Sequence, residues 1–569
     1  MFKITYGEPE KYVPSFFCDG FNYKESKIEF DVEKIEFSHT ARGCLIEFPL
    51  EGDAQVYGFG LQLKGFNHKN RKLTLRVNSD PVAYTGDSHA PVPFFVTNKG
   101  YGMYFDTARY AQVYCGFNKK RKRTDSECNL AADNIDDLYR NRSENEVSTM
   151  MVEIPGAEGI DVYIIEGKNI LDIVSQYNML SGGGCRVPEW GLGVLYRAFT
   201  NSTQKDIERL ADYFLKNDIA VDILGLEPGW QSKSYSCSYV WDKERYPDYK
   251  QLADKLTAMG YHINLWEHAF VNSLSPMYEQ LYNLSGDCEV WQGLVPDFGL
   301  SEARRIFSDY HKNNLVDLGI DGFKLDECDG SDFVASDWSF PDCAKFPSGL
   351  DGEQYHSLFG TLYMKTVMQA LGGKETLSEV RNAGALASAY PFVLYSDLYD
   401  HVDFIRGIAN SGFSGLLWTP EVRDAEGKKD FVRRLQTNVF SVQCVINAWY
   451  LEKAPWLEYD CEDEVRDLLK VRHSLVPMLK KAFDEYEKTG KPPVRALVAD
   501  YTDDEQTYDI DDEYIFCDNL IVAPLTAKSD SRKVYLPKGR WCDYWTGKEI
   551  ECGWFDVSTE NIPVYRKII

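Results

Sequence analysis

Eight apolar runs that alternate with helical stretches are the feature that most constrains how this chain can fold. They begin near residue 191, and most of them are separated by segments with a helical period. The whole strand–helix alternation extends over roughly 280 residues. The runs are Gly191–Tyr196, Val221–Leu226, His262–Trp266, Gly322–Leu325, Thr376–Val380, Val393–Tyr395, Gly415–Trp418 and Val442–Ile446. Strand–helix alternation of this number predicts an α/β fold, a (β/α)₈ TIM barrel.

The segment after the first run illustrates the helical period. Apolar residues recur at i, i+3, i+4, i+7 and i+8, on one face of a helix: Ile207, Leu210, Ala211, Phe214 and Leu215. Thr203, followed three residues later by Asp206, predicts a capping box where this helix begins.

The chain on either side of the barrel pattern is expected to form β-structure. Before the barrel, alternating stretches such as Lys72–Val77 lie between Asn, Asp and Gly turns, and a helix is expected only at about Asn169–Leu180. The run Gly182–Gly184 marks a boundary, and from about residue 490 short apolar runs again lie between turn residues. We therefore predict an N-terminal β-domain (1–185), a barrel (186–488) and a small C-terminal β-domain (489–569).

Net charge and cysteine content restrict the partners and the compartment. A formal net charge of −26 disfavours nucleic acid and anionic membranes as partners, because both would repel such a surface. The 14 cysteines contain no C-x-x-C pair, which in a 569-residue chain indicates thiols in a reducing compartment. The N-terminus has no apolar signal-peptide core, and no apolar run approaches the roughly 18 residues of a membrane span. We therefore expect a cytoplasmic protein.

Polar residues at the ends of the predicted strands indicate where chemistry can occur, because the active site of such a barrel lies at the C-terminal ends of its strands. These residues are Glu227, Glu267, His268, Lys324, Asp326, Glu327, Asp329, Glu379, Arg381, Asp397, Glu421 and Asn447. A ring of carboxylates with a few cations suits glycoside hydrolysis, in which one carboxylate attacks or stabilises an oxocarbenium-like centre and another protonates the leaving oxygen.

Motifs for other chemistries are absent from the sequence. It contains no G-x-S-x-G elbow, no P-loop or Rossmann glycine fingerprint at a strand–helix junction, and no H-E-x-x-H. No second histidine falls at metal-ligand spacing from His268. We therefore expect hydrolysis without a cofactor or a metal.

Two segments carry a resemblance to a known family. The segment GIDGFKLDECD, residues 319–329, resembles the nucleophile strand of glycoside hydrolase family 31, with Asp326 in the nucleophile position and Lys324 in a substrate-contacting position. The segment RNAGALASAYPFVLYSD, residues 381–397, resembles the stretch that runs from a substrate-binding arginine, Arg381, to the acid/base aspartate, Asp397. Asp400 and Asp403 compete for the last role, but the sixteen-residue spacing from Arg381 favours Asp397.

Further matches follow in family order over nearly the whole chain, and they include an N-terminal β-sandwich. The resemblance implies a retaining, exo-acting α-glycosidase that works by double displacement on a small oligosaccharide or glycoside. Two positions depart from the usual pattern, because Glu227 stands for an aspartate after the second strand and Asn447 for a histidine after the eighth. Glucose, galactose and xylose therefore all remain open as the terminal sugar.

The candidate substrate-binding residues are Asp80, Glu227, Trp230, Trp266, His268, Lys324, Arg381, Trp418 and Asn447. Most of them also have a structural interpretation. Asp80 also fits a turn after a strand, and Glu227 a salt bridge at the rim. The three tryptophans suit either sugar stacking or the core, because aromatic rings serve both.

Three alternative functions compete with an α-glucosidase-like hydrolase. An α-galactosidase of the same or a related barrel family would use a similar nucleophile strand, and a transglycosylase would use the same catalytic residues. A non-catalytic carbohydrate-binding relative is the alternative from another class. The joint presence of Asp326, Asp397 and Arg381 disfavours this binding protein.

Overall fold

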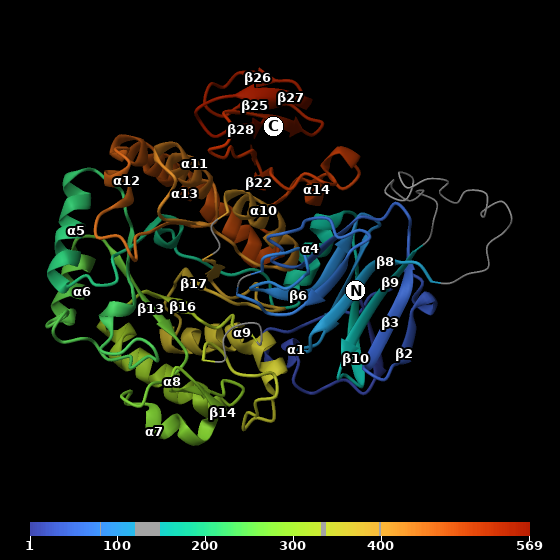
Figure 1. The fold of residues 1–569 in the computed structure, drawn as a ribbon. Coiled ribbons are helices and arrows are strands. Elements are labelled where there is room, and N and C mark those ends of the chain that lie inside the picture. The colour runs from blue at the N-terminus through green and yellow to red at the C-terminus, as the bar shows by residue number, and fades with distance from the viewer. Residues whose placement is uncertain (80, 120–147, 332–336, 398–399, 569) are drawn as a thin grey trace.

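In the computed structural model, which describes residues 1–79, 81–119, 148–331, 337–397 and 400–568, a β-sandwich, a barrel and a smaller C-terminal β-domain follow one another along the chain (Figure 1). The sandwich has two antiparallel five-stranded sheets. One sheet has the order β1 (Phe2–Gly7), β10 (Gly159–Glu166), β7 (Tyr101–Asp106), β6 (Pro91–Thr97) and β4 (Val56–Gly60). The other has the order β2 (Glu36–His39), β3 (Gly43–Leu50), β9 (Ser148–Pro155), β8 (Ala111–Phe117) and β5 (Lys72–Leu75).

Strand alternation explains how the two sheets pack. In β3 the side chains of Cys44, Ile46, Phe48 and Leu50 are buried, and the residues between them are more exposed. They meet Val113 of β8 and Ile164 of β10 in one apolar core. Helix α4 (Ile170–Met179) follows the sandwich, and Asn169 caps it by accepting a hydrogen bond from the Asp172 N–H. The helix predicted at Asn169–Leu180 is thus confirmed.

Eight parallel strands form the barrel, which confirms the predicted fold class. In sheet order they are β18 (Phe392–Leu394), β17 (Ser378–Val380), β16 (Gly322–Asp326), β13 (His262–His268), β12 (Ile223–Leu226), β11 (Val194–Arg197), β20 (Cys444–Asn447) and β19 (Glu421–Val422). A parallel bridge between Leu394 and Trp418 connects the two outer strands of this order through the residues just before β19.

Helices cover the outside of the barrel (Figure 1). They are α5 (Gln204–Lys216), α6 (Tyr249–Ala258), α8 (Ser301–Asn314), α9 (Gly352–Leu371), α10 (His401–Ser411), α11 (Lys428–Val439) and α13 (Glu462–Thr489). The predicted capping box of Thr203 and Asp206 is present at the start of α5. On the predicted apolar face Phe214 is buried, whereas Leu215 is 57% exposed. The buried face of α5 is therefore narrower than the sequence pattern predicts.

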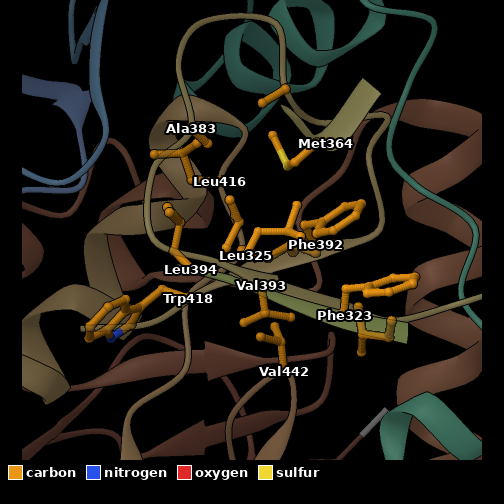
Figure 2. Packing of buried hydrophobic residues seen from close by; sticks show 14 of the residues in the cluster. Phe323, Leu325, Met364, Ala383, Phe392, Val393, Leu394, Leu416, Trp418 and Val442 are labelled. Carbon is orange, nitrogen blue, oxygen red and sulfur yellow. The ribbon is translucent and has the colours of Figure 1, made fainter. Parts of the chain in front are cut away.

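Alternate residues of a barrel strand face the helices and the barrel interior. In β16, Phe323 and Leu325 belong to the apolar layer under the helices, in the same buried cluster as Phe392 and Leu394 of β18 (Figure 2). The residues between them, Lys324 and Asp326, therefore face inward.

The barrel interior changes from apolar to charged along its axis. Leu195, Ile223 and Val445 form a small buried apolar cluster, which closes the end of the barrel where the strands begin. Two residues further along β11 and β20 stand Arg197 and Asn447, both buried. The charged layer of the barrel interior therefore lies on an apolar layer.

The C-terminal domain consists of two sheets. The larger has the order β21 (Val494–Ala496), β22 (Tyr514–Phe516), β23 (Leu520–Val522), β28 (Val564–Lys567), β25 (Trp541–Asp543) and β26 (Glu549–Ile550). The smaller pairs β24 (Ser531–Leu536) with β27 (Gly553–Ser558). In the described part of the chain, no helix combines the length and the apolar character needed to cross a membrane.

Candidate active site

Asp326 is the last residue of β16, and both of its carboxylate oxygens are held by hydrogen-bond donors. The indole Nε1 of Trp266 donates to Oδ2 at 2.7 Å, and the backbone N–H of Glu327 donates to Oδ1 at 2.9 Å. The side chain is 13% exposed. These contacts fix the direction of a carboxylate that still reaches solvent.

Arg381 connects Asp326 to Asp397. Its Nη1 lies 2.5 Å from Oδ2 of Asp397 and 3.9 Å from Oδ1 of Asp326. The distance between these two carboxylate oxygens therefore cannot exceed the sum of the two distances. Its Nε donates to Oδ2 of Asp329 at 3.1 Å. One buried guanidinium therefore gathers three carboxylates from the ends of the fourth and sixth barrel strands.

Asp397 is ionised in this arrangement. The adjacent guanidinium of Arg381 lowers the pKa of Asp397 well below its usual range, although partial burial opposes the shift. Arg423 adds to the effect, because its Nη1 lies 3.6 Å from Oδ1 of Asp397. The side chain of Asp397 is 56% exposed, so a ligand can reach it.

Lys324 lies inside the barrel between two carboxylates. Its Nζ is 3.4 Å from Oε1 of Glu421 and 3.9 Å from Oε1 of Glu227, and it stands 4.5 Å from the centre of the Tyr395 ring. Asn447 donates to the other oxygen of Glu421 at 2.9 Å. The sequence-predicted residues Glu227, Lys324 and Asn447 thus come together on the floor of the site.

Arg197 also belongs to the floor of the site, although it is not among the residues predicted from the sequence. It is fully buried, donates to Oε1 of Glu227 at 2.9 Å and to the Asn264 side chain at 3.0 Å, and forms an ion pair with Glu379. A Cβ at Gly225 would lie 2.9 Å from Arg197, so this glycine makes room for the guanidinium. Arg197 directly follows the first apolar run, and the same strand-end rule applied to that run would have identified it.

At Glu227, burial and the neighbouring cations have opposite effects on the pKa. Desolvation raises the pKa of Glu227, even though Lys324 and Arg197 both oppose the shift. Glu227 is 4% exposed, so it depends on these two cations for the stability of its charge.

A histidine from the N-terminal sandwich reaches into the site. His89 Nδ1 lies 2.7 Å from Oδ2 of Asp329, and its Nε2 lies 2.7 Å from the Ser396 hydroxyl. Burial would raise the pKa of Asp329, but Arg381 and His89 outweigh it and lower that pKa. No spacing rule connects residue 89 with a barrel strand, so His89 could not be predicted from the sequence.

The predicted tryptophans have different roles in the structure. Trp266 holds Asp326, whereas Trp230 is fully buried and donates to the backbone oxygen of Trp266 at 2.7 Å. Trp418 is 1% exposed and donates to the backbone oxygen of Phe404 at 3.2 Å. Figure 2 shows Trp418 among the core side chains. Neither Trp230 nor Trp418 offers a free face to a sugar, so we do not retain them as stacking residues.

His268 lies beside Asp326 in the barrel sheet but is enclosed by aromatic rings. Its ring centre is 5.5 Å from that of Tyr235 and 5.2 Å from that of Trp291. Burial lowers the pKa of His268 to about 3, so the ring is neutral. Tyr235 stands over it and is 43% exposed, which makes Tyr235 the more accessible residue on this side of the site. Asp80 lies outside the described residues.

Comparison with known proteins identifies the family. Residues 185–482 match the TIM-barrel domain of glycosyl hydrolase family 31, which is more than half of the chain. The chain belongs to glycoside hydrolase family 31. Residues 490–568 match the C-terminal domain of family 31, and residues 21–113 match its N-terminal galactose mutarotase-like domain.

Curated relatives of this chain include enzymes named for different sugars. An α-xylosidase of Emericella nidulans is 25% identical over 549 residues, which cover 90% of this chain and 65% of the relative. An α-glucosidase of Bacillus thermoamyloliquefaciens is 25% identical over 583 residues, which cover 93% and 68%. The chain thus spans about two thirds of the length of these relatives, and less than two thirds of the α-xylosidase.

Solved structures of family 31 share the fold. A Flavobacterium johnsoniae dextranase complexed with glucose has a TM-score of 0.78 at 21% identity, and covers 93% of this chain and 67% of its own. An α-xylosidase from a soil metagenome, complexed with xylose, has a TM-score of 0.76 at 20% identity, and covers 94% and 81%. At this identity the likeness concerns the fold.

Proposed function

We propose that the protein is a retaining, exo-acting α-glycosidase in which Asp326 is the nucleophile and Asp397 the general acid/base. The observation that carries this proposal is the position of Arg381 between the two carboxylates. The distances from its Nη1 to Asp326 and Asp397 limit the two oxygens to a separation below the about 6.5–9.5 Å of inverting glycosidases. They leave room for the about 5–5.5 Å of retaining ones.

In the first step an Asp326 oxygen bonds to the anomeric carbon while the bond to the leaving oxygen breaks, and Asp397 gives its proton to that oxygen. In the second step a water oxygen bonds to the anomeric carbon, Asp397 takes the water proton, and the ester bond to Asp326 breaks. The hydrogen bonds from Trp266 and from the Glu327 N–H restrain Asp326 in both steps.

Arg381 must loosen its hold on Asp397 when the substrate binds, because an ionised Asp397 cannot protonate the leaving oxygen. The exposed Asp397 side chain is free to change its contacts, whereas Arg381 keeps Asp329 as a second, buried partner. Desolvation by the sugar then raises the pKa of Asp397 toward the working range of a general acid.

A closed floor supports action on a terminal sugar. Arg197, Glu227, Lys324 and Glu421 are buried beneath the Asp326 carboxylate, with an apolar layer below them. A site closed on this side accepts one terminal ring and leaves the rest of a glycoside at the open side of the barrel. The other candidate substrate contacts remain proposals: Asp80, Glu227, Trp266, His268, Lys324, Arg381 and Asn447. The boundaries 1–185, 186–488 and 489–569 also remain our proposed domain boundaries.

Among the possible substrates we place α-glucosides and α-xylosides first, because the relatives described above are named for activity on these. A panel of 4-nitrophenyl α-glycosides, extended to the galactoside, separates the alternatives. We expect wild type to hydrolyse one member, and Asp326→Asn to lose at least about 10⁴-fold in kcat. The exposed Asp317→Asn should keep wild-type rates as a matched control. Wild-type-like turnover by Asp326→Asn would refute the nucleophile assignment, and binding without turnover across the panel would favour a non-catalytic protein.

A further inference from the structure

Glu327 differs from the other carboxyl groups around Asp326 because it has no cationic partner. Asp326, Asp329 and Asp397 all lie within 4.0 Å of Arg381, and the floor carboxylates Glu227, Glu379 and Glu421 are paired with Arg197 or Lys324. In the described part of the chain, no Lys, Arg or His nitrogen lies within 4.0 Å of the Glu327 carboxyl. Ion pairing therefore does not account for the presence of the Glu327 carboxyl beside Asp326.

The position of Glu327 is fixed tightly with respect to the nucleophile. Its backbone N–H donates to Oδ1 of Asp326 at 2.9 Å, and its φ of +55° lies in the left-handed region that side chains other than glycine rarely adopt. A strained residue of this kind persists only where the surroundings enforce it, and such residues concentrate at functional sites.

The side chain of Glu327 lies toward the second and third barrel strands. The Tyr235 hydroxyl donates to its Oε1 at 3.4 Å, and the Tyr235 ring is centred 5.5 Å from that of Trp266, which also holds Asp326. Arg381 and Asp397 approach Asp326 from the fifth and sixth strands. Glu327 therefore borders the reacting position from a different side than the acid/base residue.

The surroundings of Glu327 favour the neutral form of its carboxyl group. Burial and the adjacent Asp326 carboxylate raise the pKa of Glu327 well above its usual range, and Arg381 opposes them only in part. A neutral carboxyl has one O–H donor, which an ionised carboxylate lacks. Because Tyr235 donates to Glu327, that contact does not use the O–H.

We propose that Glu327 is a specificity-determining residue whose carboxyl group donates a hydrogen bond to one hydroxyl of the terminal sugar. This inference rests on the proposed function. A neutral donor beside Asp326 can hold a sugar hydroxyl without repelling the nucleophile, which a second charged carboxylate would do.

The test compares wild type and Glu327→Ala on the fastest aryl α-glycoside and on its monodeoxy analogues. On the parent substrate, Glu327→Ala should lower kcat/KM about 10- to 100-fold. On the one analogue that lacks the recognised hydroxyl, that penalty should fall below about twofold, because the partner of Glu327 is already missing. Glu302→Ala, an exposed change on α8, serves as the control.

Glu327→Gln separates hydrogen bonding from proton transfer, because the amide donates but does not ionise. We expect it to keep most of the wild-type kcat/KM and to extend activity to higher pH. The reason is that wild type loses its donor as pH rises through the raised pKa of Glu327. If Glu327→Gln were as impaired as Glu327→Ala, a proton-transfer role would replace the one proposed.

The outcomes distinguish this inference from the proposed function. If wild type hydrolyses the parent and the Glu327→Ala penalty is the same on every deoxy analogue, only the inference on Glu327 fails. Wild-type-like kinetics of Glu327→Ala would also refute only the inference on Glu327. If wild type hydrolyses no member of the panel, the proposed function fails, and the inference falls with it.

Discussion

At the residue scale, the role proposed for Asp326 as nucleophile depends on hydrogen-bond donors that the protein supplies in advance. Trp266 Nε1 and the Glu327 N–H each hold one oxygen, and Arg381 lies 3.9 Å from one of them. Donors of this kind orient the proposed nucleophile before the sugar arrives, which lowers the cost of reaching the transition state.

Trp266→Phe tests this restraint. The change keeps an aromatic ring in a buried position but removes the donor to Asp326, so we expect kcat to fall about 10- to 100-fold. Steady-state kinetics on the preferred aryl glycoside provide the measurement. Trp541→Phe removes a comparable indole donor to the Pro537 backbone oxygen in the C-terminal domain, and should leave kcat unchanged. Equal rates for wild type and Trp266→Phe would show that this hydrogen bond does not position the proposed nucleophile.

Much of the site was predictable because polar residues at barrel-strand ends converge. Lys324, Asp326, Arg381 and Asp397 come together as that rule requires. The rule fails for residues whose environment comes from packing. Trp418 ends a predicted strand, yet its ring packs into the core, where its indole N–H finds a backbone acceptor.

At the element scale, a small residue on one barrel strand makes room for a large charged side chain on the neighbouring strand. Arg197 of β11 pairs in register with Gly225 of β12, and the glycine leaves the space that the guanidinium occupies. A larger residue on β12 would push Arg197 away from Glu227 and Glu379. Glu379 would lose its ion-pair partner, and Glu227 would keep only Lys324.

Gly225→Ala should therefore damage both stability and activity. Its Cβ would meet Arg197 and the strand cannot move freely, so we expect a loss of about 1–3 kcal/mol in the free energy of unfolding. We also expect a lower kcat/KM, because Glu227 and Lys324 share the same charge network. Denaturant unfolding and kinetics measure the two effects. A variant with unchanged stability and activity would show that Arg197 has space elsewhere.

The strand–helix pattern was sufficient to predict the barrel, but two elements were not predictable. The seventh run was expected at Gly415–Trp418, whereas the strand is Glu421–Val422, because Gly415 has a φ of +70° and ends a 3₁₀ turn. The hairpin of β14 (Ser285–Val290) and β15 (Gly293–Pro296) was missed. Its turn residues Trp291 and Gln292 both have positive φ, where Asn-Gly is the usual signal.

At the scale of the whole molecule, the N-terminal sandwich is part of the site. His89 is buried between Asp329 and Ser396, and the Asn382 side chain donates to its backbone oxygen at 2.6 Å. Because Asp329 also binds Arg381, the sandwich influences the residue that connects the two proposed catalytic carboxylates. Sequence patterns describe neighbours along the chain, so they could not reveal this contact between domains.

His89→Ala should lower activity from within a different domain. Loss of the imidazole removes a partner of Asp329 and weakens the placement of Arg381, so kcat/KM should fall about 10-fold or more. Kinetics measured well below the melting temperature separate this effect from unfolding. The exposed His39→Ala on β2 is the matched control and should behave as wild type. Unchanged kinetics in His89→Ala would limit the role of the sandwich to stability.

The most direct test of double displacement is the configuration of the first product. Proton NMR during hydrolysis of the preferred aryl α-glycoside shows which anomer of the sugar appears before mutarotation. Two successive inversions, at Asp326 and then at water, predict that the α-anomer appears first. Initial release of the β-anomer would contradict a covalent intermediate on Asp326 and the role proposed for Asp397.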